Sequence, residues 1–171
     1  VSFELIDYRH VKGKFDRIVS VGMAEHLGKK FYRTYFKKIY DLLKDDGLSL
    51  VHTIGSIDQP QPAAPFIQKY IFPGGIVPSL SDLITPIEKT GLIVNDIETL
   101  IRHYDKTLEH WLKRFSEKKI EVREMFSDKF VKMWEFYLGS CASAFKYREK
   151  VVLKLQLVKN IEYITSNRRD Y

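Results

Sequence analysis

Two stretches of the chain end an apolar run with a side chain that can exchange a proton. Residues 18–21 form the first run, and Glu25 follows it closely. Residues 48–51 form the second run, and His52 follows it directly. In open α/β sheets, ligands bind in the crevice beyond the carboxyl ends of parallel strands. A carboxylate and an imidazole delivered there by neighbouring strands indicate a site for acid–base chemistry.

The hydrophobic pattern predicts the elements that would position these groups. Strands are expected at 2–6, 15–22, 48–54, 92–98 and 151–158, and helices at 30–44, 79–90, 104–118 and 128–145. Asp45-Asp46-Gly47 is predicted to end the first helix and turn the chain into the next strand. Strand, helix and strand over 15–54 form a βαβ unit, so the sheet is expected to be parallel and the fold α/β.

Composition and the positions of the prolines indicate how the chain is divided into domains and loops. Its 171 residues are 44% hydrophobic, which is typical of one globular domain. The segment 55–79 holds five of the six prolines and is predicted to be a long irregular loop, yet the run Phe66 to Phe72 is too aromatic for a simple linker. We expect one domain over residues 1–159, ending in a strand, and a frayed polar tail over 160–171.

Charge and cysteine content narrow the classes of partner. The single cysteine excludes an internal disulfide and favours a reducing cytoplasm. No apolar run reaches about 18 residues, so no membrane-spanning helix is predicted, and no signal peptide is visible. The net charge of +6 comes from residues 100–171, and such a surface either attracts nucleic acid or anionic lipid or is simply solvated. The sequence has no recognition helix or aromatic–basic platform, so we expect no nucleic-acid partner.

No metal site is expected. His26 and His103 could be mistaken for metal ligands, but neither has a second ligand three or four residues further on. The chain starts without a methionine and in what reads as mid-strand. We therefore expect it to be a C-terminal piece of a longer protein.

Several stretches, in order over residues 3–158, resemble the cyclopropane-fatty-acyl-phospholipid synthases, which are S-adenosylmethionine (SAM)-dependent enzymes related to the mycolic acid cyclopropane synthases. They are Asp7–Arg9, Phe15–Gly28, His52–Gly55, Lys69–Gly74 with Pro78–Ser79, and His103–Leu108 with Trp111, continued by Tyr137–Leu138, Cys141, Phe145 and Gln156. The resemblance implies a partial Rossmann-like class I methyltransferase fold, a mostly parallel sheet with a reversed last strand and helices on its faces. The family's first strands and Gly-rich SAM turn would precede Asp7. The isolated piece is therefore expected to be inactive.

The implied reaction adds a methylene from SAM across a cis double bond of a phospholipid acyl chain, through a carbocation that bound bicarbonate deprotonates. The resemblance assigns Glu25, His52, Tyr104 and the backbone amide of Ile54 to the bicarbonate. Glu25 would accept its hydroxyl hydrogen bond, His52 would donate to it or take up its proton, and Tyr104 would donate its phenol. Cys141 matches a cysteine regarded as catalytic in the family, although its place on an apolar stripe predicts an inert, buried thiol.

Two more residues match the cofactor site of the family, and one departs from its pattern. Asp7 and Tyr8 fall where the adenine of SAM would lie, so they are candidate cofactor contacts. Ala24 stands where the family usually has an aromatic residue. Each candidate also has a structural interpretation: Glu25 as a helix cap, His52 as a satisfied structural residue, Tyr104 as a packed ring, and Asp7 and Tyr8 as a turn residue and a packed aromatic.

The resemblance implies a phospholipid bilayer with unsaturated acyl chains as a peripheral partner. The aromatic segment 66–75 either lines an acyl entrance or fills the core, and anionic headgroups would meet Lys113, Arg114, Lys118, Lys119 and Arg123. The intact protein is then expected in the cytoplasm, reversibly bound to the inner face of the membrane, with a homodimer formed through the absent N-terminal part. Two alternatives stay open: a related SAM-dependent lipid C-methyltransferase that makes methyl-branched or hydroxylated chains, and a non-catalytic lipid- or partner-binding domain.

Overall fold

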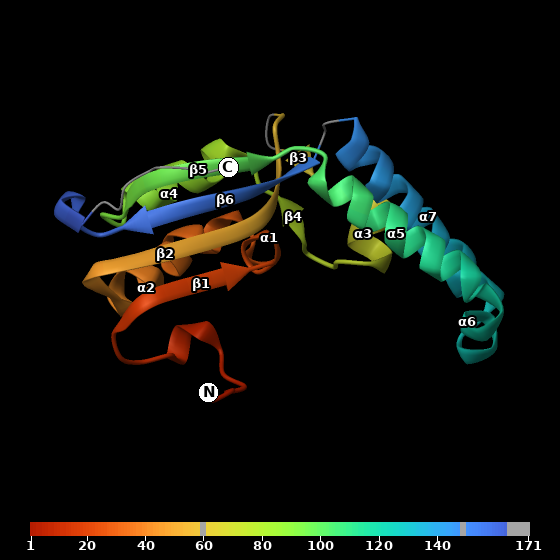
Figure 1. Cartoon of the computed structure of the whole chain (residues 1–171), viewed down its shortest axis with the longest axis horizontal. Coiled ribbons are helices and arrows are strands. Elements are labelled where there is room, and N and C mark those ends of the chain that lie inside the picture. Colours follow the sequence, from red (N-terminus) through yellow and green to blue (C-terminus); the bar gives the residue numbers. More distant parts are fainter. Residues whose placement is uncertain (59–60, 148–149, 164–171) are drawn as a thin grey trace.

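The computed structural model describes residues 1–58, 61–147 and 150–163 and is built around one mixed sheet (Figure 1). Its strands are β1 (Phe15–Val21), β2 (Leu43–Ser56), β5 (Ile93–Leu100) and β6 (Lys150–Val158), in the order β1-β2-β6-β5. β1 and β2 are parallel, whereas β6 is antiparallel to both of its neighbours. Three strands therefore run one way and the last strand is reversed, which confirms the predicted α/β fold.

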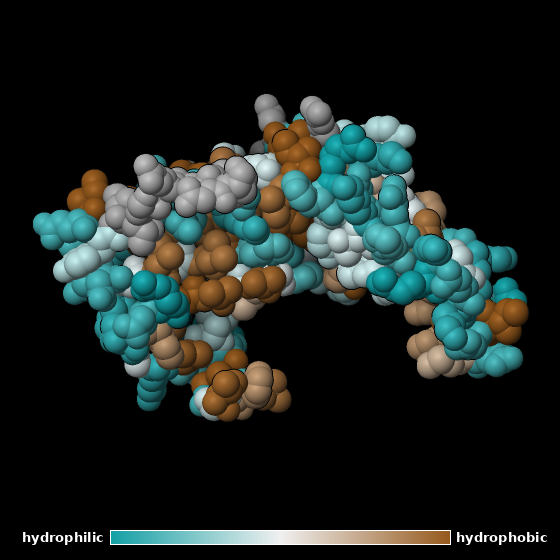
Figure 2. Space-filling view, viewed as in Figure 1, coloured by the Kyte–Doolittle hydropathy of each residue, from teal (hydrophilic) through white to brown (hydrophobic). Residues whose placement is uncertain are grey.

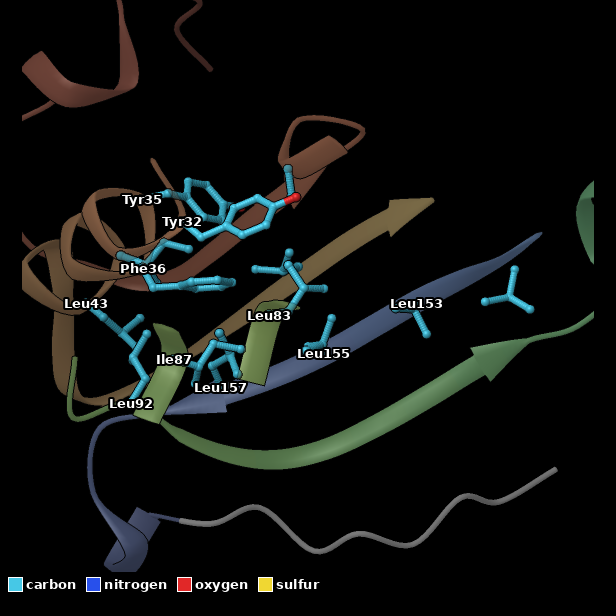
Figure 3. Packing of buried hydrophobic residues seen from close by; sticks show 14 residues of the cluster. Tyr32, Tyr35, Phe36, Leu43, Leu83, Ile87, Leu92, Leu153, Leu155 and Leu157 are labelled. Carbon is cyan, nitrogen blue, oxygen red and sulfur yellow. The ribbon is translucent and has the colours of Figure 1, made fainter. Parts of the chain in front are cut away.

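One face of the sheet is covered by α2 (Tyr32–Leu42) and α4 (Leu80–Glu88). Their apolar faces meet alternate residues of β2 and β6, and Figure 3 shows these side chains interlocking. We call this group the core cluster; its buried members are Ala24, Tyr32, Tyr35, Phe36, Ile39, Leu43, Val51, Leu83, Ile87, Leu92, Val151, Leu153, Leu155 and Leu157. Ser79 caps α4 in a reciprocal capping box with Asp82.

Three further helices form an arm that projects beyond the end of the sheet (Figure 1): α5 (His103–Glu117), α6 (Lys119–Met125) and α7 (Asp128–Lys146). α5 packs along α7, and α6 lies at the free end. Where the arm joins the sheet, a second apolar group packs on the other face; we call it the arm cluster. Its buried members are Leu108, Tyr137, Leu138, Phe145 and Val152, and Ile54, Tyr104 and Cys141 are among the partly buried residues around them.

Short elements complete the chain. They are η1 (Tyr8–His10), α1 (Ala24–Leu27), η2 (Lys29–Phe31), β3 (Gln61–Pro62), α3 (Pro65–Tyr70), β4 (Ile76–Val77) and η3 (Ile161–Tyr163). The segment 55–79 is thus less irregular than predicted, because α3 lies inside it and β3 pairs with β4. Of the predicted tail, η3 is described, and residues 164–171 lie outside the described residues.

The predicted strand at 2–6 is wrong. These residues are extended without a strand partner in the described sheet, and Phe3 and Leu5 are 95% and 109% exposed. Alternating apolar residues form a strand only where a neighbour takes up their backbone hydrogen bonds. β1 is instead the edge strand of the sheet, with Val19 and Val21 65% and 62% exposed.

The predicted turn at Asp45-Asp46-Gly47 is also wrong in its place. α2 ends at Leu42, and β2 already pairs at Leu43 with Phe15; the next pair is Leu48 with Arg17. Four residues of β2 therefore bulge out opposite a single residue of β1. Gly47 closes the bulge, since a Cβ there would stand 2.6 Å from the Leu43 side chain and 2.9 Å from the Lys44 carbonyl.

Candidate active site

Glu25 is a buried carboxylate held at the end of the sheet. β1 stops at Val21, and Gly22, with φ +65°, turns the chain into α1. Glu25 then lies in the first turn of α1, 8% exposed. The Thr53 hydroxyl of β2 donates to Glu25 Oε2 at 2.6 Å, and no donor is recorded for Oε1 among the described residues. The interpretation of Glu25 as a helix cap is wrong, because Met23 occupies the N-cap, and its side chain makes no capping hydrogen bond.

His52 and Ile54 bring two more polar groups to the same end of β2. The His52 carbonyl accepts from the Gly22 amide at 3.0 Å, just past the end of β1. Since alternate residues of a strand direct their amides to the same side, the Ile54 amide points to the side where β1 has ended. The His52 Nδ1 atom is buried and has no hydrogen-bond partner among the described residues. Such a buried atom fits a hydrogen-bonding ligand that is not part of the protein.

Tyr104 reaches this region from the first turn of α5. Its ring packs against Phe145 at 4.8 Å between centroids and against Trp111 at 6.1 Å. Burial, then the nearby carboxylate of Glu25, then Cys141 raise the pKa of the Tyr104 phenol. Glu25 and Cys141 therefore each lie within electrostatic range of Tyr104. Among the described side chains, no hydrogen bond joins Glu25, His52 and Tyr104 directly.

The start of α5 is fixed by an ion pair beside Tyr104. Arg102 has left-handed backbone with φ 62°, and its guanidinium lies 3.5 Å from the buried carboxylate of Asp105. A left-handed conformation costs energy for a residue other than glycine, so it persists only where surrounding contacts impose it. This strained turn sets the direction from which α5 presents Tyr104.

Cys141 lies on the same apolar surface but has the properties of a neutral thiol. It is partly buried in the arm cluster, and burial raises its pKa to about 11, with a hydrogen bond from Ser140 opposing the effect. Neighbouring Tyr137 has a pKa raised to about 12, first by burial and then by Cys141 and Tyr104. A thiol with a raised pKa is a poor nucleophile near neutral pH, because the thiolate is the reactive form.

The predicted cofactor contacts Asp7 and Tyr8 lie at the start of η1. Asp7 caps η1 and pairs with Arg9 at 2.7 Å, and these bonds hold the pKa of its carboxyl well below its usual range. Tyr8 is partly buried and meets the Tyr35 ring edge-on at 5.8 Å. Both are therefore engaged within the chain in this structure.

The aromatic segment 66–75 closes one side of the candidate site. Phe72 meets the His26 ring of α1 at 5.2 Å and the Tyr137 ring of α7 at 6.1 Å. Phe66 packs on Phe136 of α7 at 4.8 Å. Phe66, Ile67 and Ile71 fill the arm cluster, whereas Tyr70 and Phe72 stay 46% and 39% exposed. The segment therefore fills the core and also offers two exposed rings.

Two negative findings limit the chemistry of the described part of the chain. No group of three or more His, Cys, Asp or Glu side chains there could hold a metal ion. Every helix in that part is too short or too polar to cross a bilayer.

Thr53 is the functional contact that sequence reasoning passed over. It occupies an inward-facing position of β2 between Val51 and Gly55 and is fully buried. A buried hydroxyl needs a partner, so an isolated threonine on an apolar strand face is a signal for a nearby polar side chain. Knowing that this partner is Glu25 requires the register between β1 and β2.

Solved structures place this geometry in a class of protein. The chain superimposes on the mycolic acid cyclopropane synthase CmaA1, solved with SAH and CTAB, with a TM-score of 0.80 and 28% identity over 88% of this chain and 57% of that one. The fold is therefore the α/β fold of SAM-dependent methyltransferases.

The chain belongs to the family whose model is described as mycolic acid cyclopropane synthetase, which matches residues 1–155. It is 38% identical over 162 residues to the cyclopropane-fatty-acyl-phospholipid synthase of Escherichia coli strain K12, covering 95% of this chain and 42% of that protein. It is 36% identical to a probable fatty acid methyltransferase of Pseudomonas putida, covering 85% and 39%. The chain thus spans less than half the length of these curated relatives.

Proposed function

We propose that the protein containing this chain is a SAM-dependent cyclopropane synthase that acts on cis double bonds of unsaturated phospholipid acyl chains. The family match and the E. coli relative support this reaction. The observation that carries it is the buried Glu25 carboxylate, held by Thr53 within electrostatic range of Tyr104. His52, the residue before Thr53, adds a buried nitrogen that has no partner among the described residues. These are acid–base groups in an apolar surrounding, as the reaction requires.

The polar groups at the end of β2 fit a small oxyanion such as bicarbonate. Glu25 Oε1 would accept a hydrogen bond from the ion's hydroxyl, while the Ile54 amide and the Tyr104 phenol would donate to its other oxygens. His52 Nδ1 has no hydrogen-bond partner among the described residues, so it could donate to the ion or accept from it. Bound there, bicarbonate would supply a base for the proton that is lost when the ring closes.

The surroundings suit an apolar substrate. Tyr104, Tyr137 and Phe145 belong to the arm cluster, and Phe72 closes it from the aromatic segment. An alkene brings no charge that would need solvation, whereas a lone carboxylate base in such a place would be costly to desolvate. Thr53 reduces this cost for Glu25 by donating a hydrogen bond to it.

For SAM, these 171 residues offer only part of a site. The resemblance assigns two cofactor contacts within them: Asp7, which pairs with Arg9, and Tyr8, which packs against Tyr35. We therefore expect the isolated chain to bind SAM weakly or not at all, and isothermal calorimetry on it checks this. Tight binding would contradict the proposal that the rest of the protein completes the site.

The test of the reaction uses the full-length protein, isotopically labelled SAM and a phospholipid with cis-unsaturated chains. Cyclopropanation predicts a product that gains one methylene in mass and no longer adds hydrogen on catalytic hydrogenation. No labelled lipid at all would exclude every lipid methyltransferase activity.

A second candidate function is methyl branching of the acyl chain. The P. putida relative, a probable fatty acid methyltransferase, favours it at 36% identity. The same experiment separates the two, because a methylene-branched or methylated product keeps an alkene or gains a methyl group, which proton NMR distinguishes from a three-membered ring.

A further inference from the structure

The free end of the arm carries large apolar side chains that are open to solvent. Ile120, Met125 and Phe126 are 70%, 73% and 59% exposed, and all belong to α6 or to its C-terminal cap. Figure 2 shows brown and tan surface at this end of the molecule, set among teal hydrophilic residues. Several large apolar side chains exposed together at one end of a protein indicate an interaction site there.

The exposure is imposed by the packing of the arm. The Phe126 ring stacks on Phe130 at 4.4 Å, and Phe130 stacks on Trp134 at 5.7 Å, so a ladder of rings supports Phe126 from α7. The ion pairs Lys119–Glu135 and Arg123–Asp128 tie α6 to α7. A tip held in this way is ordered before it meets a partner, which lowers the entropy lost on binding.

Positive charge without an internal partner surrounds the tip. Three of the acidic side chains near it, Glu121, Asp128 and Glu135, are already engaged in ion pairs. Glu117 and Glu124 are the acidic side chains left over among the described residues 113–135. The same residues include four exposed cations that form no ion pair with a described side chain: Lys113, Arg114, Lys129 and Lys132. The last turns of α5 and the first turns of α7 carry these four, directly beside the tip.

We infer that this tip, α6 with Phe126 and the four cations, inserts into the boundary between headgroups and acyl chains of an anionic bilayer. The inference rests on the proposed function, which requires access to phospholipid. A short helix with exposed apolar residues and flanking Lys and Arg is the chemistry that lies in a membrane interface. Anionic headgroups complement the four free cations, and each cation near such a surface strengthens binding by about fivefold.

A bilayer is favoured over a folded protein partner by the form of this end of the molecule. α6 lies at the free end of a projecting arm (Figure 1), and its large apolar side chains Ile120 and Met125 are exposed there. A protein interface would need a broad complementary surface. A bilayer takes up a projecting tip without a matching shape.

The test measures binding of the full-length protein to vesicles of phosphatidylethanolamine and phosphatidylglycerol by cosedimentation. The double variant Ile120→Ser, Met125→Ser is expected to bind about tenfold more weakly or worse. Ile161→Ser is the matched control, since Ile161 is 67% exposed on η3 at the opposite end of the molecule, and its binding is expected to equal that of the wild type.

A second pair of variants tests the charges. Lys129→Gln with Lys132→Gln is expected to weaken binding to phosphatidylglycerol vesicles and to leave weak binding to phosphatidylcholine vesicles unchanged. Lys12→Gln with Lys89→Gln is the control, because both are exposed cations away from the arm. Brominated lipids are expected to quench the fluorescence of Trp134, which stands at the base of the ring ladder.

The outcomes separate this inference from the reaction. Tip variants that bind vesicles as the wild type does would overturn it, as would a loss of binding in the Ile161 control alone. A change in oligomeric mass with the tip variants and no lipid binding by the wild type would assign the tip to a second copy instead. Turnover of detergent-dispersed lipid tests the reaction separately. A protein that binds vesicles through the tip but does not turn over lipid would contradict only the proposed function.

Discussion

The two apolar clusters of the molecule differ in what they enclose. The core cluster lies between the sheet and the helices α2 and α4, and its 14 buried members are at most 5% exposed. The arm cluster has five buried members, and more than twice as many of its residues are only partly buried. Tyr104 and Cys141 belong to the second group, and Glu25 stands within electrostatic range of Tyr104.

The core cluster mainly stabilises the fold, whereas the candidate site borders the arm cluster. A closed cluster of buried aliphatic and aromatic side chains stabilises the sheet and offers no room for a ligand. A looser cluster rich in rings and hydroxyls, at the carboxyl ends of strands, leaves polar atoms available at its border. Substitutions in the two clusters should therefore affect different measurements.

The largest effect is expected from Glu25→Gln. Removing the carboxylate while keeping its shape is expected to lower kcat of the full-length protein by about a thousandfold. The neutral amide of Gln is a weaker hydrogen-bond acceptor than a carboxylate and does not take up a proton. The melting temperature is expected to change little. Glu88→Gln, an exposed change of the same kind on α4, is the control for charge. Near-normal turnover in E25Q would remove the chemistry from this end of the sheet.

Leu155→Ala probes the other cluster. Leu155 is fully buried, so its truncation is expected to cost about 3 kcal/mol of unfolding free energy through lost burial and a cavity. Denaturant unfolding measures this, with Leu5→Ala, at a fully exposed position, as the neutral control. Activity per folded molecule should be kept. A large loss of activity at full stability would mean that the two clusters are not separate.

Thr53→Val tests the hydrogen bond that links the core cluster to the candidate site. Thr53 faces the core cluster but donates to Glu25 at 2.6 Å. The isosteric valine is expected to lower kcat about tenfold, by leaving Glu25 without its donor, with stability changed by about 1 kcal/mol. Thr34→Val, at an exposed position of α2, is the control. If kcat is unchanged in T53V, Thr53 does not position Glu25.

The smallest effect is expected from Cys141→Ala, with less than about a threefold change in kcat at pH 7, since a thiol with a pKa of about 11 is protonated there. Because folding raises this pKa above 9, the stabilising contribution of the thiol is present below pH 9 and is lost as pH rises through 11. Thermal unfolding from pH 8 to 11 should then show wild type losing stability faster than C141A. A thousandfold loss of activity in both C141A and C141S would restore the cysteine as a catalytic residue.

The sequence predicted most of the architecture because its signals are local. The apolar stripe of α2 and the alternation in β2 and β6 each depend on neighbours within a few residues. The pattern at 2–6 is equally strand-like, but no partner strand pairs with it in the described sheet, and local pattern does not report a missing partner. The bulge at Gly47 was missed for a related reason, since Asp-Asp-Gly signals a turn equally well inside a strand.

The candidate site was predictable in its members and not in its contacts. Glu25, His52 and Tyr104 were marked by strand ends and by family resemblance. The hydrogen bond from Thr53, the unpartnered His52 nitrogen and the neighbourhood of Tyr104 and Glu25 depend on register and on the angle at which α5 leaves the sheet. They are features of tertiary structure. The strained turn at Arg102 and packing on Phe145, for example, set the position of Tyr104.

The bare edge of β1 has a practical consequence for anyone who handles this chain by itself. An edge strand with solvent-facing valines and open backbone groups can recruit a like strand from another molecule. Concentrated solutions of the 171 residues are then expected to form β-rich aggregates through this edge, and a lysine in place of Val19 is the natural remedy for solubility.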